Sequence, residues 1–252
     1  MVLKWSRGNA KLDALEKIVG GQVWTFSTLS GWTCPMAQDC MSRAVSEAGK
    51  LSILDGPATK FRCFSASQEV LFPAVYRARK HNLEMLKTCG NNAHKMTDMI
   101  LDSLPRKAAC VRIHVGGDMF TLNYFQAWCD VAALNKSVLF YAYTKSLGMW
   151  VKLAERKAIP ENLILTASRG GREDDKIRKY NLRETIVVHT EAEADALGYP
   201  IDHDDSHAAL PEWRDVSFAL LIHGIQPAGS EAGKAVRALN GVGSYSKNKG
   251  TK

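Results

Sequence analysis

The chain alternates between two kinds of hydrophobic pattern. Short apolar runs rich in β-branched and aromatic residues are typical of strands, and nearly all are followed by a segment whose apolar residues recur at helical spacing. The predicted strands are residues 23–29, 60–65, 110–115, 137–143, 162–167, 185–189 and 216–223. The predicted helices are residues 67–86, 93–104, 122–134, 147–157, 174–180, 191–197 and 230–239. The order is therefore β then α, repeated.

This alternation predicts a parallel sheet, because each helix carries the chain back to the start of the next strand. Strands such as 111–115 are apolar along most of their length, as expected when both faces of a sheet are covered. Such units fit a complete or partial β/α barrel of the TIM type better than a doubly wound sheet. No Pro-, Gly- or Ser-rich stretch divides the 252 residues. We therefore expect one barrel domain over 1–252, with 1–20 as an N-terminal lead-in and 241–252 as a flexible basic tail.

Polar and Gly-rich sequence follows most of the predicted strands. In α/β folds, ligands bind where strands end and loops begin. The strand-end residues that we expect to bind a cofactor are Gly116, Gly117, Asp118, Ser168 and His223. Lys145 ends the fourth strand and is a candidate catalytic residue that would meet an anionic substrate or a negatively charged cofactor. The alternative for Lys145 is an ordinary solvated lysine.

The densest group of titratable residues lies between 203 and 207. His203, Asp205 and His207 are candidate catalytic residues, because imidazole and carboxylate groups at this spacing can act as acid and base or bind a second metal. The alternatives are a cap for the next helix and an Asp-rich turn before Pro211.

The predicted compartment decides how the six cysteines are interpreted. No apolar run approaches the ~20 residues that span a bilayer, and the N-terminus lacks the apolar segment of a secretory signal. We therefore expect a cytoplasmic protein with no membrane partner. A reducing cytoplasm disfavours disulfides and leaves metal binding, redox chemistry or burial for the cysteines.

Three of the cysteines are candidate metal ligands. Five residues separate Cys34 from Cys40, in a loop that Gly31 and Pro35 keep irregular, and Cys63 lies in the next predicted strand. Neighbouring strands would bring the three thiolates to one point near the barrel mouth. Iron–sulfur clusters take thiolate ligands, and three cysteines leave one iron for another ligand. Burial and a zinc site are the alternatives, although structural zinc normally has four ligands.

The other cysteines have different expected roles. Cys110 opens a strand and Cys129 lies on a helix, so both are expected in the core, whereas Cys89 lies in a Gly-rich turn and is a candidate fourth ligand. The net charge of +7 permits a nucleic-acid partner, but the basic residues are scattered apart from 77–80 and the tail. A small-molecule ligand or a redox partner is therefore favoured, and nucleic acid stays an alternative.

Several sequence blocks occur in the order found in a known family. They are FSTLSGWTCPMAQDC, KFRCFSASQEV, VRIHVGGDMF, FYAYTKS, LTASRGGR, IDHDDSHA and FALLIHGIQPAGS. Together they cover about 23–239 and resemble the gene-product-eighty-eight family, encoded by phages of actinobacteria. The resemblance implies a phage protein that works in the cytoplasm of the infected bacterium and holds an iron–sulfur (4Fe-4S) cluster.

A looser similarity is to radical S-adenosylmethionine enzymes. Those enzymes have a β/α barrel, a cluster held by three cysteines near the first strand, and a Gly-Gly-acidic motif, which Gly116-Gly117-Asp118 matches in order. Their cysteines stand in one loop, whereas Cys63 here follows separately. The similarity implies a cluster enzyme that binds S-adenosylmethionine at an open iron. The alternatives are an electron-transfer or redox-sensing protein, with Cys89 or a histidine as fourth ligand, and a binding protein whose cluster only stabilises the fold.

Overall fold

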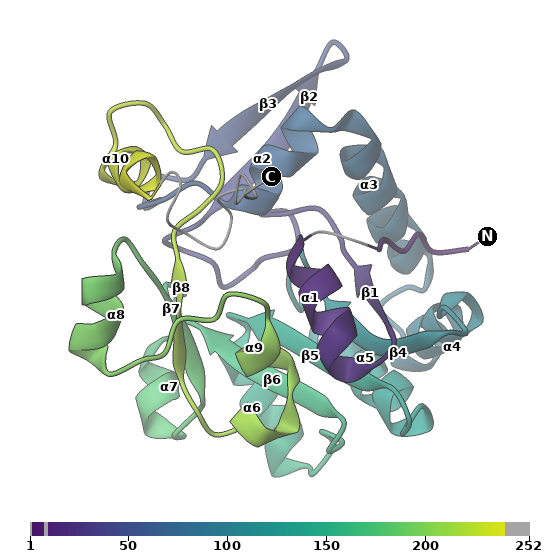
Figure 1. Ribbon diagram of the computed structural model, residues 1–252. Coiled ribbons are helices and arrows are strands. Elements are labelled where there is room, and N and C mark those ends of the chain that lie inside the picture. Colours follow the sequence, from purple (N-terminus) through teal and green to yellow (C-terminus); the bar gives the residue numbers. More distant parts are fainter. Residues whose placement is uncertain (1, 8–9, 240–252) are drawn as a thin grey trace, which may run out of the picture.

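The computed structural model describes residues 2–7 and 10–239, and a parallel six-stranded sheet curled into a half-barrel forms its centre (Figure 1). Neighbouring strands follow one another in the chain, apart from the hairpin between the first two. In spatial order they are β1 (Gln22–Phe26), β4 (Ala108–Ile113), β5 (Leu139–Thr144), β6 (Leu163–Ser168), β7 (Glu184–Val188) and β8 (Phe218–Leu221). The prediction of a partial TIM-like β/α barrel is confirmed.

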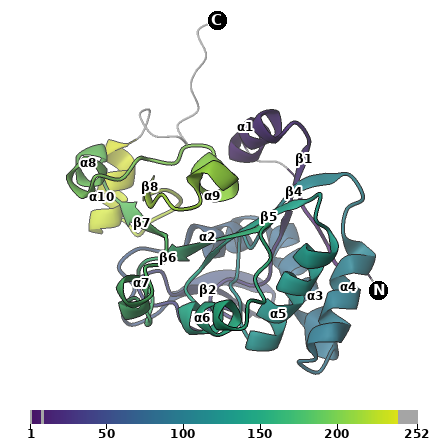
Figure 2. The same cartoon turned by 90° about the horizontal axis from the view of Figure 1, so that it is seen from below.

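Helices cover the convex face of the sheet. The connecting helices are α5 (Leu122–Leu134), α6 (Leu147–Glu155), α7 (Asp175–Lys179) and α8 (Glu191–Leu197), and α4 (Ala93–Ser103) packs beside α5. Val111 and Ile113 of β4 point to this side and join one apolar core with Phe125 and Trp128 of α5. Figure 2 shows α5 and α6 on one side of the sheet.

The concave face is filled by two short helices. Leu12 and Leu15 of α1 (Ala10–Val19) pack with Ala208 and Ala209 of α9 (Ser206–Ala209). Inward-facing residues of the sheet, among them Cys110, Tyr141 and Ile164, complete this second core, and Figure 2 shows both helices opposite α5. The interior of the half-barrel is thus packed by α1 and α9, and a cavity opens near the carboxyl ends of the strands.

Side-chain caps fix the starts of several helices. Asn92, Thr121, Thr190 and Ser230 each accept a hydrogen bond from a backbone N–H in the first turn of α4, α5, α8 and α10 (Glu231–Ala238), respectively. Such caps satisfy backbone donors that the helix itself leaves without acceptors. The starts of these four helices lie within one residue of the predictions.

The predicted strand 60–65 is wrong. Residues 61–63 are irregular, and α2 (Phe64–Leu71) begins directly after Cys63. The predicted helix 67–86 is two helices, α2 and α3 (Pro73–Thr88), because the proline at residue 73 cannot donate the backbone hydrogen bond that would continue α2.

The pattern of apolar residues also missed a hairpin and α1. The strands β2 (Ser42–Glu47) and β3 (Lys50–Asp55) pair antiparallel outside the half-barrel, joined at Ala48 and Gly49, which both have positive φ. No helix of the described residues is long and apolar enough to cross a membrane. The predicted tail, 241–252, lies outside the described residues.

Candidate functional site

A cavity of about 170 Å³ opens at the carboxyl ends of the strands. Its walls include all three candidate metal ligands, Cys34, Cys40 and Cys63, and all five candidate cofactor-binding residues, Gly116, Gly117, Asp118, Ser168 and His223. Lys145 and Asp205 also line it. Most of the candidate site residues therefore line one cavity, although they lie far apart along the chain.

Two irregular segments present the cysteines. The loop of Cys34 and Cys40 is anchored to the end of β6, because the N–H groups of Gln38 and Asp39 donate to Gly170 O at 3.2 and 2.9 Å. Cys63 reaches the cavity as the residue before α2, and its N–H donates to Ser42 Oγ at 3.2 Å. The three cysteines thus line the same cavity, but Cys63 lies at a helix start and not within a strand.

The electrostatic environment keeps these thiols protonated in the absence of a cation. Burial raises the pKa of Cys34 well above its ordinary value, and the charges of Asp118, Cys63 and Cys40 raise it further. Burial likewise raises the pKa of Cys63 to about 12. The pKa of Cys40 is also raised by burial, while the ammonium of Lys145 opposes the shift. A metal bound here would displace these protons, since metals bind thiolates.

The Gly-Gly-Asp segment is a rigid wall of the cavity. His114, at φ 68°, donates from Nδ1 to Gly116 O at 3.2 Å, because a carbonyl can only accept, and its Nε2 accepts from Tyr124 OH at 3.1 Å. Burial lowers the pKa of His114 to about 4, so the ring is neutral. Gly117 has φ 90°, and a Cβ there would overlap Thr28 Oγ1. Only glycine fits at this position.

Asp118 and Lys145 form the polar side of the cavity. The carboxylate of Asp118 accepts from Thr144 Oγ1 at 2.6 Å and from the N–H of Lys145 at 2.8 Å, yet burial raises its pKa to about 6. The ammonium of Lys145 donates to Ser168 O at 2.8 Å, Ser168 Oγ at 3.0 Å and Arg169 O at 2.6 Å. Lys145 is therefore a buried, fixed cation, and the alternative of a solvated lysine is wrong.

The structure does not bring His203, Asp205 and His207 together. Only Asp205 reaches the cavity, where its carboxylate accepts from Arg112 Nη1 at 2.5 Å and from Tyr141 OH at 2.9 Å. His203 is exposed, and the His207 ring packs on the Trp213 ring at a centroid distance of 4.3 Å. The imidazoles diverge because Asp205 has positive φ, at 65°, and turns the chain into α9. Asp204 Oδ1 accepts from the Ser206 N–H at 3.0 Å, as in an Asp-rich turn, but no side chain caps α9.

Residues that the sequence did not single out complete the cavity. Arg112 and Tyr143 face inward from β4 and β5, with the guanidinium 5.2 Å from the ring centroid, and form part of its floor with Asp205. Val187, Leu220 and Ile222 supply an apolar wall. Strand alternation gives the faces of each strand, but it does not reveal which face is the inside of the barrel. The cavity thus offers one polar and one apolar side to a ligand.

The cysteines do not form a preassembled site for a single ion. Among the residues that the structure describes, no group of three or more His, Cys, Asp or Glu side chains is arranged as the ligands of one metal ion. In a cubane cluster the thiolates bind different irons, so they are spread more widely than the ligands of a single ion. An assignment of metal therefore rests on the shared cavity of the three thiols and on their chemistry.

Comparison with known proteins identifies a family. The model of the family described as gene product 88 matches residues 3–239. No curated protein and no solved structure matches the chain. The comparisons therefore lend no support to the looser similarity to radical S-adenosylmethionine enzymes.

Proposed function

Since the chain belongs to the gene product 88 family, we propose that this phage protein holds a 4Fe-4S cluster through Cys34, Cys40 and Cys63. The observation that carries the proposal is where the six cysteines lie in the fold. These three line one cavity at the strand ends, while Cys89, Cys110 and Cys129 are buried in the apolar cores or beside them. Packing alone does not explain why three cysteines from two distant segments line one polar cavity.

The surroundings suit such a cluster. Three thiolates and bridging sulfides carry net negative charge, and the Lys145 ammonium lies close enough to Cys40 to lower the pKa of that thiol. Gly31 N–H donates to Cys34 Sγ at 3.3 Å, the kind of contact that stabilises a thiolate. Bound there, the cluster would supply an electron carrier and, at its fourth iron, a Lewis acid.

The rest of the cavity suits a small ligand beside that iron. Asp118, Ser168 and the Gly116-Gly117 backbone form a polar wall, and Val187 and Leu220 lie on the apolar one. A ligand with an amino or hydroxyl group and an apolar body would satisfy both walls. S-adenosylmethionine is the first candidate, on the grounds of the three cysteines and the order of the Gly-Gly-Asp segment. We place the activity in the cytoplasm of the infected host.

Electron transfer or redox sensing is the second candidate function, and it needs a fourth protein ligand. Cys89 does not line the cavity; its Sγ lies 4.0 Å from Met99 Sδ. His223 does line it, with Nδ1 donating to Leu221 O at 3.1 Å, so that Nε2 is the ligand atom in this alternative. His114 uses both ring nitrogens in hydrogen bonds.

The first experiment is anaerobic purification with iron and sulfide analysis. We expect about four irons per chain in the wild type, substantial loss in each of C34A, C40A and C63A, and full retention in the matched control C89A. A full iron content in any of the three cavity variants would overturn the ligand assignment. Electron paramagnetic resonance then separates the two functions. A spectrum that changes when S-adenosylmethionine is added supports an open iron. A spectrum that ignores S-adenosylmethionine but changes in the H223A variant supports full ligation by the protein.

A further inference from the structure

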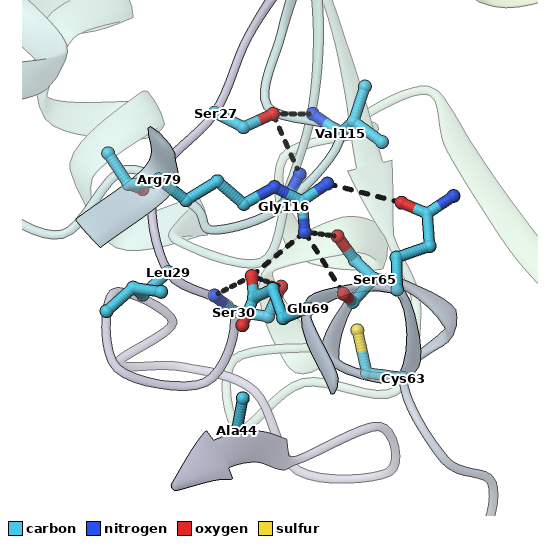
Figure 3. Close-up of polar contacts among 12 residues, drawn as sticks. Ser27, Leu29, Ser30, Ala44, Cys63, Ser65, Glu69, Arg79, Val115 and Gly116 are labelled. Atoms are coloured by element: carbon cyan, nitrogen blue, oxygen red, sulfur yellow. Dashed lines mark hydrogen bonds and ion pairs between the residues drawn. The ribbon is translucent and has the colours of Figure 1, made fainter. Parts of the chain in front are cut away.

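A buried ion pair between α2 and α3 lies next to Ser65 and Gly116, two residues of the cavity wall (Figure 3). Glu69 of α2 is fully buried and Arg79 of α3 is 6% exposed, and the distance from Arg79 Nη1 to Glu69 Oε1 is 2.9 Å. Neither side chain takes part in the proposed ligation. Both belong to helices that the sequence predicted as one, so no pattern in the sequence pointed to the pair.

The pair joins the segments that carry the candidate ligands. Glu69 Oε1 accepts from both the N–H and the Oγ of Ser30 at 2.9 Å, which fixes the start of the Cys34 loop. Arg79 Nη1 donates to Ser65 Oγ at 2.7 Å and Ser65 O at 3.0 Å, two residues after Cys63. Figure 3 shows how the guanidinium reaches across to these groups and lies beside Gly116.

Gly116 is part of the same arrangement. A Cβ at this position would lie 2.6 Å from Arg79 Nη1 and 2.5 Å from Ser65 Oγ, so the absence of a side chain lets the guanidinium contact the backbone of the Gly-Gly-Asp wall. Three separate segments of the cavity therefore meet at one cation and one anion.

Stability alone does not account for this pair. A buried ion pair loses hydration that its mutual attraction only partly restores, and well-packed apolar residues often serve as well. Glu69 Oε2 moreover has no hydrogen-bond partner among the described residues. Charges this close to a low-dielectric site are, however, felt strongly by any group that gains or loses an electron there.

We propose that Glu69 and Arg79 are positioning residues for the cluster-binding segments. Their opposite charges together would also determine the electrostatic potential at the cluster, and with it the midpoint potential. The inference rests on the proposed function. While both charges are present, they largely cancel. Loss of either leaves the other unopposed behind Cys63 and Gly116, in a region that water does not screen.

The test is a redox titration of the reconstituted protein, followed by electron paramagnetic resonance. Reduction adds one negative charge to the cluster, so the lone Arg79 cation in E69Q should raise the midpoint potential. The lone Glu69 carboxylate in R79Q should lower it. E69Q/R79Q should return close to the wild type, and R79K, which keeps the charge, should shift little.

The exposed Lys80–Glu84 pair on α3 supplies matched controls, and K80Q and E84Q should leave the potential unchanged. Shifts of the same sign in E69Q and R79Q, or a shift in R79K as large as in R79Q, would overturn the electrostatic role. If the single Gln variants do not fold, R79K and the double variant still test it. A wild-type protein without iron would instead refute the proposed function, which iron analysis decides independently.

Discussion

The side-chain amide of Gln226 hydrogen-bonds both the backbone N–H and the backbone carbonyl of Arg62. Its Oε1 accepts from the Arg62 N–H at 2.8 Å, and its Nε2 donates to the Arg62 carbonyl at 3.0 Å, although 164 residues separate the two. Arg62 directly precedes Cys63. The loop after the last strand therefore fastens the segment that carries the third candidate ligand, and links β8 to the open side of the half-barrel.

We predict that Q226A weakens the hold on the cluster without unfolding the protein. The substitution removes both hydrogen bonds to Arg62, each worth about 0.5–1.5 kcal/mol, so Cys63 should detach more readily. Iron loss to a chelator should become roughly tenfold faster. Q126A, which removes a contact to Asp130 on the surface of α5, is the control. Equal rates of iron loss in Q226A and wild type would show that the clamp plays no part.

Gly117 should be far less tolerant of substitution than another glycine with the same backbone requirement. Gly117 and Gly198 both have positive φ, but a Cβ at Gly198 meets no atom within 4 Å, whereas at Gly117 it overlaps Thr28 Oγ1. We expect G198A to lower the free energy of unfolding by about 1 kcal/mol through backbone strain. G117A should add roughly 1–3 kcal/mol from the overlap.

Urea unfolding of the two variants measures this difference. A loss in G117A no larger than that in G198A would mean that the Gly-Gly-Asp wall yields easily. The wall would then be unfit to fix the position of a ligand.

The strands were predictable because their apolar runs are long and punctuated by turns. The parallel order places their carboxyl ends at one edge, so the sequence could bring Gly116, Asp118 and Ser168 to one cavity. Segment 60–65 misled because its aromatic residues are typical of a strand, while its conformation is set by distant groups such as Gln226 and Ser42. The local pattern of apolar and polar residues does not predict such long-range contacts.

The sequence analysis did not predict the β2–β3 hairpin or the cavity-facing residues such as Arg112, for other reasons. Residues 42–47 and 50–55 are largely polar, because the hairpin lies outside the sheet and buries only part of one face. Arg112 faces the cavity because the sheet curls toward that side. The alternation of residues along a single strand does not predict the direction of this curvature. His203 and His207 were grouped by spacing, but the turn at Asp205 separates them.

Asp118 should make the stability of the protein without cluster depend on pH. Burial raises its folded-state pKa from 3.8 to about 6. A carboxyl with a raised pKa contributes stability that is fully present below pH 3.8 and is lost as the pH rises through 6. The loss should be on the order of 2–3 kcal/mol, because each tenfold change in proton affinity corresponds to about 1.4 kcal/mol.

Unfolding free energies measured from pH 3.5 to 7.5 test this in comparison with D118N, which cannot ionise. The slope between pH 4 and 6 should be smaller in D118N than in wild type, and unchanged in D98N, where the carboxyl is exposed on α4. Identical slopes in all three proteins would remove Asp118 as the source.

Lys145 is predicted to activate Cys40 for metal binding. Its ammonium opposes the effect of burial on the pKa of that thiol and is fixed by three hydrogen bonds to Ser168 and Arg169. In K145M the pKa of Cys40 should rise further, so at a fixed pH fewer Cys40 thiols are ionised. Alkylation of Cys40 in the iron-free protein, followed by mass spectrometry, should slow several-fold, because only the thiolate reacts. Alkylation of Cys89, which lies outside the cavity, is the internal control, and K80M removes a surface charge of the same kind. A rate at Cys40 that is unchanged in K145M, or reduced equally at Cys89, would assign Lys145 a role in holding β5 to β6 and none in the chemistry of the thiols.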